Sequence, residues 1–147
     1  MRVRELMTAD PVCCTADTPI ENVARLMADR DCGAIPIVGD LETRMPLGII
    51  TDRDIVIRGI AAGRDSKTLT ARDCMTSPVV TVVADASVRD CVELLELTQI
   101  RRLLVVDDAG KCCGIVAQAD IARNASKRET GELLREVSKP SVPAFTS

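Results

Sequence analysis

The 147-residue sequence predicts a mixed α/β (α+β) fold, in which two similar units of the order strand, helix, strand, strand, helix pack with pseudo-twofold symmetry. The first observation is an internal repeat: Met7-Thr8 recurs 68 residues later as Met75-Thr76, and Ala16-Asp17 recurs as Ala84-Asp85. The second is size, because a unit of about 55 residues buries little apolar surface and would be only marginally stable alone. We therefore expect the two units to pack on each other as one body.

The sequence divides into four segments. We expect a first unit with an N-terminal linker segment, a connector, a second unit, and a C-terminal helix with a flexible tail, at residues 1–62, 63–75, 76–125 and 126–147. The connector is assigned because residues 63–68 are polar. The last helix is assigned because Ser126 and Glu129 have the spacing of a capping box.

An amphipathic helix is expected in each unit, around 19–30 and 87–98, because apolar residues recur at i, i+3, i+4 and i+7. These stripes are Ile20, Val23, Ala24 and Met27 in the first helix and Val88, Cys91, Val92 and Leu95 in the second. Thr18 is the expected N-cap of the first helix, with Pro19 at its first position. Ser87 is the expected N-cap of the second.

Two apolar strands joined by a polar turn are expected after each helix. In the first unit they are residues 34–38 and a strand ending at 50, and in the second unit residues 102–106 and a strand ending at 116. The repeat offset falls from 68 to 66 across the turn, so the first turn is two residues longer. Short helices at 52–62 and about 118–125 complete the two units.

Composition excludes several classes of function. The sequence has no His, Trp or Tyr, and its one aromatic residue is Phe145. A Ser-His-Asp triad, an imidazole metal site and aromatic stacking of bases are therefore excluded. Net charge is −3, which gives no support for binding to nucleic acid or to an acidic membrane. No apolar run is long enough to span a bilayer and the start has no signal-peptide pattern, so we expect a cytoplasmic protein.

Seven cysteines are an odd number, and in a reducing compartment most are expected to be buried. Two adjacent pairs, Cys13-Cys14 and Cys112-Cys113, lie on predicted strands, where neighbouring side chains point to opposite faces. The spacing lacks the Cys-x-x-Cys pattern of zinc sites, so no metal site is expected. Thiol or metal sensing remains an alternative.

The most specific segment runs from Gly48 to Asp54, at a strand-to-helix junction. Backbone N–H groups at a helix start can receive a phosphate, Thr51 can donate its hydroxyl, and Asp54 can accept from a ribose diol. The alternative is a plain helix cap made by Thr51 and Asp54. The second copy keeps the acid, as Asp120, but has Ala117 in place of the cap, which a capping role alone does not explain.

Four features taken in order resemble the tandem cystathionine-β-synthase-type (CBS) domain pair, or Bateman module. They are the Asp-Thr-Pro-Ile helix start at 17–20, the Gly-Ala-Ile-Pro-Ile strand at 33–37, the Gly-Ile-Ile-Thr-x-x-Asp segment at 48–54, and their second-half copies. The resemblance covers residues 1 to about 125 and is greatest to small stand-alone bacterial proteins of hypoxia or stress responses. It implies an adenosine nucleotide, such as AMP, ATP or an NAD-like ligand, as a regulatory ligand in two clefts between the units.

The resemblance also implies roles for individual residues. Asp54 and Asp120 would hold ribose hydroxyls, Thr51 would touch phosphate, and Thr81 or Cys13 would lie near the adenine. The backbone of residues 34–37 and 102–105, which includes Ala34, would read the adenine edge. Aliphatic side chains would sandwich the ring, namely those of Ile35, Pro36, Ile49, Leu103 and Ile115.

Arg53, Arg101 and Arg102 are the cations best placed to meet phosphate oxygens, because guanidinium groups suit them. Their alternative role is a surface ion pair with Asp52, Asp107 or Asp108.

We therefore expect a non-catalytic nucleotide sensor without a catalytic cofactor. The resemblance implies a homodimer formed through the helices at 19–30, 52–62, 87–98 and 118–125. The alternative is a ligand-free structural dimer or a protein that responds to redox state or metal through its cysteines.

Overall fold

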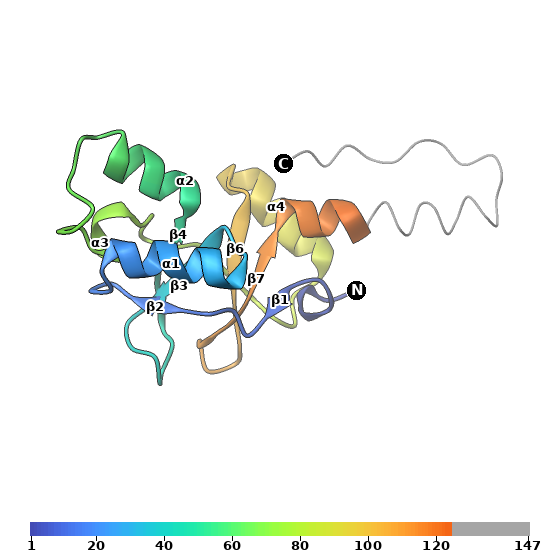
Figure 1. Cartoon of the computed structure of the whole chain (residues 1–147). Coiled ribbons are helices and arrows are strands. Elements are labelled where there is room, and N and C mark those ends of the chain that lie inside the picture. The colour runs from blue at the N-terminus through green and yellow to red at the C-terminus, as the bar shows by residue number, and fades with distance from the viewer. Residues whose placement is uncertain (125–147) are drawn as a thin grey trace.

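The computed structural model describes residues 1–124, which form two helix-flanked sheets lying side by side (Figure 1). The three-stranded sheet has the order β2-β3-β4, formed by Cys14–Thr15, Ala34–Val38 and Pro46–Thr51. The four-stranded sheet has the order β1-β7-β6-β5, formed by Thr8–Ala9, Cys112–Ala117, Arg102–Val106 and Thr81–Val83. This mixed architecture of two similar units confirms the predicted fold class.

The repeat is visible in the strand registers. Strands β3 and β4 pair antiparallel with Ile35 opposite Ile50, and β6 and β7 pair antiparallel with Leu103 opposite Val116. The short strands β2 and β5 each run parallel to the first strand of these hairpins. The 68- and 66-residue offsets therefore relate equivalent positions of the two sheets.

Two long helices cover the sheets, α1 at Ile20–Arg30 and α4 at Val88–Thr98. The shorter helices are a 3₁₀ turn at Val3–Glu5, α2 at Asp52–Asp54, a π-helix at Ile55–Ile60, and α3 at Ala71–Cys74. A further helix begins after β7 and occupies 118–124. None of the helices within residues 1–124 has both the length and the apolar character needed to cross a bilayer.

Each unit is completed by chain from the other half. Strand β1 pairs antiparallel with β7 of the second unit, with Thr8 opposite Ile115. The N-terminal segment, which the sequence analysis assigns to the first unit, thus packs on the second, and Val3 is fully buried in the second core. In the reverse direction, the connector residues Leu69, Ala71 and Cys74 are buried in the first core.

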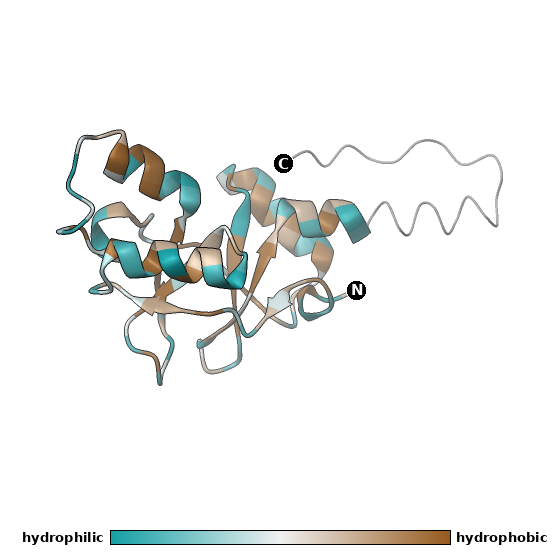
Figure 2. Ribbon diagram, in the orientation of Figure 1, coloured by the Kyte–Doolittle hydropathy of each residue, from teal (hydrophilic) through white to brown (hydrophobic). Residues whose placement is uncertain are grey.

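The buried apolar residues form three clusters, one within each unit and one between them. The two long helices alternate between hydrophobic and hydrophilic positions along their length (Figure 2). The central cluster contains Val38, Leu104, Cys112 and Ile115. Cys13, Ile49 and Val79 pack against it. Adjacent cysteines face opposite ways, as expected, because Cys14 lies in the first core and Cys113 packs on the second.

The predicted cap of the first long helix is wrong. Thr18 does not cap α1, whose N-cap is Pro19 without a side-chain hydrogen bond. The first N–H of the helix, on Ile20, instead donates to the carbonyl of Leu69 at 2.8 Å, so the connector performs the capping. By contrast, Ser87 caps α4 as predicted, accepting from the N–H of Asp90 at 3.1 Å.

The expected helix at 52–62 is present, covering Asp52 to Ile60, but most of it does not have α geometry. After one turn of α2 it becomes a π-helix, in which Ala61 N–H bonds to the carbonyl of Val56 and Arg64 N–H to that of Gly59. Gly59 allows this wider turn to approach Leu69, whose Cδ1 would lie 3.3 Å from a Cβ at that position. The predicted C-terminal helix and tail lie outside the described residues.

Candidate functional site

Two cavities lie at equivalent positions of the repeat. Each is formed by the strand-to-helix junction of one unit and by the linker and strand entrance of the other. The first is lined by Ile49, Thr51, Asp54, Thr76, Pro78, Val79, Val80, Ile100, Arg101 and Arg102. The second is lined by residues 8–12, 30–34, Arg102, Ile115, Ala117, Asp120 and Arg123.

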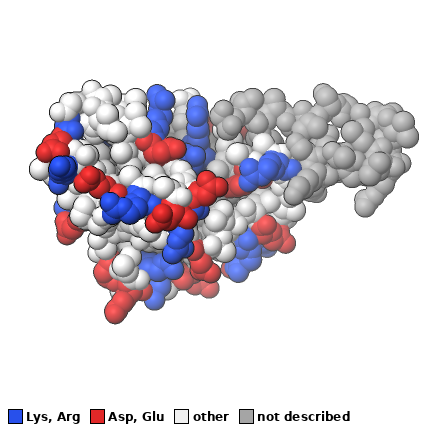
Figure 3. Space-filling view, viewed as in Figure 1, with Lys and Arg blue, Asp and Glu red and all other residues white. Residues whose placement is uncertain are grey.

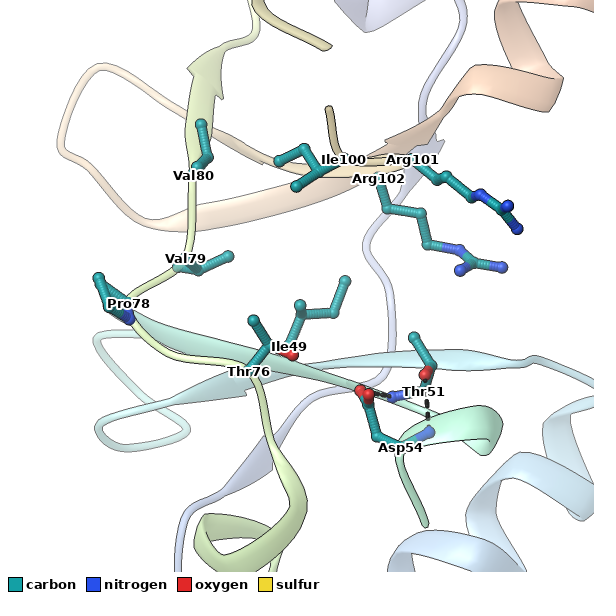
Figure 4. Close-up of a pocket in the computed structure, with 10 residues that line it drawn as sticks. All are labelled: Ile49, Thr51, Asp54, Thr76, Pro78, Val79, Val80, Ile100, Arg101 and Arg102. Atoms are coloured by element: carbon teal, nitrogen blue, oxygen red, sulfur yellow. Dashed lines mark hydrogen bonds between the residues drawn. The ribbon is translucent and has the colours of Figure 1, made fainter. Parts of the chain in front are cut away.

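The first cavity has an apolar end and a polar end (Figure 4). Ile49, Val79, Val80 and Ile100 lie at one end, whereas the guanidinium groups of Arg101 and Arg102 extend toward the side where Thr51 lies. Its volume is about 230 Å³, against about 610 Å³ for the second cavity. Small-molecule sites usually begin at about 300 Å³, so a nucleotide in the first cavity would project from it or displace side chains.

Thr51 and Asp54 form a reciprocal capping box at the polar end of the first cavity. The hydroxyl oxygen of Thr51 accepts from Asp54 N–H at 3.1 Å, and Asp54 Oδ2 accepts from Thr51 N–H at 2.9 Å. The plain capping alternative is thus present in the structure. It leaves two groups for a ligand, because the Thr51 hydroxyl hydrogen can still be donated and Asp54 Oδ1 has no hydrogen-bond partner among residues 1–124.

Asp120 is arranged differently in the second cavity. Its Oδ2 accepts from Ala117 N–H at 2.9 Å, so the acid keeps half of the capping box without a hydroxyl partner. This corrects the argument that capping does not explain the retained acid. Its Oδ1 accepts from the guanidinium of Arg123, with which it forms an ion pair. Both oxygens of Asp120 are therefore occupied.

The three arginines selected from the sequence have different positions. Arg101 and Arg102 line the first cavity, and Arg102 also lines the second. Arg53 is exposed on α2 and lines neither cavity. Within the part of the chain that the structure describes, none of the three forms the ion pair considered as their alternative role.

Several other predicted site residues do not line either cavity. The side chains of Ile35, Pro36 and Leu103 are fully buried in the body of the sheets, so they are not placed to sandwich a ring. Thr81 is exposed on β5 and lines a separate cavity. Cys13 lies beside Arg44 rather than in a cleft.

Three of the predicted residues do line a cavity. Ile49 lines the first cavity, and Ile115 and Ala34 line the second. The backbone of 34–36 and 102–103 is paired on one side only, because β2 reaches only residues 37–38 and β5 only 104–106. Its free side remains available for backbone hydrogen bonding at these positions.

Sequence reasoning missed the linker residues that form the other wall, Thr76, Pro78, Val79 and Val80. Their equivalents at 8–12 line the second cavity. The signal was the repeat of Met7-Thr8 as Met75-Thr76, which marks the two crossing segments.

The described surface and cavities show no concentration of metal ligands. Within residues 1–124, no group of three or more Cys, Asp or Glu side chains is close enough together to hold a metal ion. On the face drawn in Figure 3, basic and acidic side chains are interspersed. That face therefore offers no continuous basic field to a polyanion.

Comparison with known proteins identifies the fold. A model of the CBS domain matches twice, at residues 3–59 and 71–127. Hypoxic response protein 1 of Mycobacterium tuberculosis is 35% identical over 141 residues, which cover 96% of this chain and 96% of that protein.

Two solved structures carry adenosine compounds. The CBS domain pair of protein MJ0100, in complex with 5-methylthioadenosine and S-adenosyl-L-methionine, is 27% identical with a TM-score of 0.73, covering 84% of this chain and 98% of that one. CBSX2 in complex with AMP is 26% identical with a TM-score of 0.70, covering 86% of this chain and 97% of that one. Because the family model matches each half of the repeat and the Mycobacterium relative matches nearly the whole chain, this protein belongs to the CBS domain family.

Proposed function

We propose that the protein is a non-catalytic regulatory module that binds an adenosine nucleotide in the first cavity. The observation that carries the proposal is the open carboxylate oxygen of Asp54 beside the Thr51 hydroxyl. A carboxylate oxygen accepts well from ribose hydroxyls, and a hydroxyl and two guanidinium groups can donate to phosphate. The aliphatic end of the cavity would receive the base.

The ligands of similar structures support an adenosine compound, since AMP, methylthioadenosine and S-adenosylmethionine share the adenosine group. The two arginines favour a phosphate over a sulfonium cation, because like charges at close range are unfavourable. AMP and ATP are therefore the preferred candidates.

The first cavity is favoured over the second. Ribose binding at Asp120 would have to displace Arg123 from its carboxylate. Asp54 needs no such rearrangement, because its Oδ1 has no partner within the described residues.

Regulation would follow from the composition of the cavity walls. Ile49, Thr51 and Asp54 come from the first unit and Ile100 to Arg102 from the second, so a ligand contacts both. A ligand that bridges two units stabilises the arrangement that it fits. We propose no catalytic step, because among residues 1–124 Asp54 is the one acid that lines this cavity and no second acid or base accompanies it.

We also propose that two copies associate through their helices. Val56, Ile57 and Ile60 on the π-helix and Leu97 on α4 are exposed apolar side chains, with Ile60 64% and Leu97 82% exposed. Both helices belong to the set that the sequence analysis expects at a dimer interface.

The test is ligand binding by calorimetry and thermal melting with AMP, ATP and NAD. Asp54→Asn retains an oxygen for the Thr51 N–H but replaces the open acceptor by an amide. We expect it to weaken AMP binding about tenfold or more, as for loss of a charge-assisted hydrogen bond of ~1.5–3 kcal/mol. Asp120→Asn is the matched control and should retain the affinity. The proposal would be excluded if millimolar AMP, ATP or NAD did not raise the melting temperature of the wild-type protein.

A further inference from the structure

Two cysteines from different units meet in the central cluster. Cys13 precedes β2 of the first unit and Cys112 begins β7 of the second. Cys112 belongs to the cluster and is 2% exposed, whereas Cys13 packs against it and is half-buried. Small molecules can therefore reach the pair from the side of Cys13.

Arg44 contacts both cysteines. Its Nη2 donates to Cys13 Sγ at 3.3 Å and to the carbonyl of Pro11 at 3.1 Å. Its own carbonyl accepts from Cys112 N–H at 2.9 Å. Arg44, in the longer first turn, thus holds its guanidinium against the sulfur of Cys13 and its carbonyl against the backbone N–H of Cys112.

The turn that carries Arg44 is well defined. The carboxylate of Asp40 accepts from Glu42 N–H at 2.9 Å and from Thr43 N–H at 2.7 Å. Arg44 itself has φ of 54°, in the left-handed region that favours glycine. At the equivalent position of the second unit stands a glycine, Gly110, with φ of 82°. The first turn therefore holds an arginine in a conformation that disfavours a side chain.

The arrangement of two cysteines and an arginine occurs in only one of the two positions related by the repeat. The repeat offsets relate Cys13, Arg44 and Cys112 to Thr81, Gly110 and Pro46. Thr81, Gly110 and Pro46 line an open cavity and do not form an equivalent packed group. The sulfur pair with its arginine is therefore not a requirement of the repeated fold.

The environment separates the two thiols chemically. A hydrogen bond from the Cys112 thiol, with a further contribution from Arg44, lowers the pKa of Cys13 to about 6. The same hydrogen bond, followed by burial, raises the pKa of Cys112. The lowered pKa favours the thiolate form of Cys13 and the raised pKa favours the thiol form of Cys112. Thiolates are the reactive form of cysteine.

We propose that Cys13 and Cys112 are a peroxide-sensitive pair that closes into a disulfide between the two units. The Cys13 thiolate attacks hydrogen peroxide, forming an S–O bond while the O–O bond breaks and hydroxide leaves. Loss of the thiolate removes the charge that holds the proton on Cys112. The Cys112 sulfur then attacks the sulfenic acid, forming the S–S bond, and the S–O bond breaks to release water with the Cys112 proton. In sum, one thiolate and one thiol are oxidised to a disulfide, and one peroxide is reduced to a hydroxide, which takes a proton from solvent, and a water.

The site of this bond connects it to both cavities. Ile49 and Val79 of the same cluster line the first cavity, and Ile115 lines the second. A disulfide at this position would restrict the movement of the cluster residues that line the two cavities. The oxidation itself does not depend on the proposed nucleotide binding.

The test is to treat the purified full-length chain with hydrogen peroxide at pH 7, block the remaining thiols, and map disulfides by non-reducing mass spectrometry. We expect a linked pair of peptides whose fragmentation assigns the bond to Cys13 and Cys112. The link should be absent in Cys13→Ser and Cys112→Ser and should persist in Cys113→Ser, whose side chain lies on the opposite face of β7.

The wild-type result decides the proposal even if a variant fails to fold. A Cys13–Cys112 link that is reversed by dithiothreitol supports it. Oxidation that stops at Cys13 as sulfenic or sulfinic acid, a bond between other cysteines, or no reaction would overturn it.

Discussion

A Cβ built on Gly48 would lie 2.6 Å from the carbonyl oxygen of Thr76, closer than real Cβ atoms approach an oxygen. The contact exists because Thr76 crosses β4 here, exchanging two backbone hydrogen bonds with Ile49 at 2.8 and 3.1 Å. A Cβ on the equivalent glycine, Gly114, would meet the side chain of Met7 and lie 3.1 Å from the carbonyl oxygen of Thr8. Both glycines of the repeated motif therefore admit a crossing segment from the other half.

Gly48→Ala should destabilise the fold by about 1–3 kcal/mol, as overpacking of a tight contact does. The free energy of unfolding can be measured by urea titration. Gly39→Ala is the control, because its nearest neighbour would be a carbonyl oxygen at 4.0 Å. Equal losses in the two variants would contradict the steric explanation.

Arg102→Gln should weaken AMP binding about tenfold, because it removes a charged donor to phosphate, while adenosine affinity stays unchanged. Isothermal titration with both ligands measures the difference. Arg53→Gln removes an exposed guanidinium outside both cavities and should change neither affinity. An equal loss for AMP and adenosine would place Arg102 away from the phosphate.

Alkylation of Cys13 by iodoacetamide should follow a titration with its midpoint near pH 6, since the pKa of Cys13 is lowered to about 6. A lowered pKa means that the thiolate persists down to that pH and is lost below it. The charged and titratable groups facing this sulfur are Cys112 and Arg44, with Asp10 beside the arginine. Peptide mapping after short pulses at each pH gives the rate.

Arg44→Met retains much of the side-chain volume without its charge. The midpoint should then move upward toward the ordinary cysteine value, because a cation that stabilises the thiolate is lost. Alkylation of Cys32, which is half-buried elsewhere, serves as the internal reference. An unmoved midpoint would show that Arg44 does not stabilise the Cys13 thiolate.

Ile60→Asp should convert a dimer into a monomer, because it places a charge in the proposed apolar interface. Light scattering would report a mass near 15.8 kDa for the variant and twice that for the wild type. Leu41→Asp is the matched control, since Leu41 is 60% exposed but lies in the turn between β3 and β4. A wild-type chain that is already monomeric would exclude this interface.

The repeat and the apolar periodicity predicted the two-unit fold because both are visible in the residue pattern without any knowledge of tertiary contacts. The N-cap of α1 could not be found in this way, since Ile20 N–H is satisfied by Leu69, which lies far along the chain. The π-helix likewise depends on the close approach of Gly59 to Leu69. Tertiary contacts decided both features.

The site was predicted in part for a similar reason. The strand-to-helix motif identified Thr51 and Asp54, which lie together at one cavity. The alternation of strand side chains indicates only that residues face opposite sides, so it did not show that Ile35 and Leu103 face the cores. The opposite wall, with Val79 and Val80, comes from a linker whose crossing is a long-range event.

The exchanged linkers have a consequence for how the chain acquires its fold. The second core is completed by Val3 from the N-terminal segment, and the first core is completed by Leu69, Ala71 and Cys74 from the connector. A fragment ending after the first sheet would expose the apolar surface that the connector covers. The single polypeptide thus behaves as an intramolecular strand-swapped dimer, which should melt in one cooperative transition instead of two.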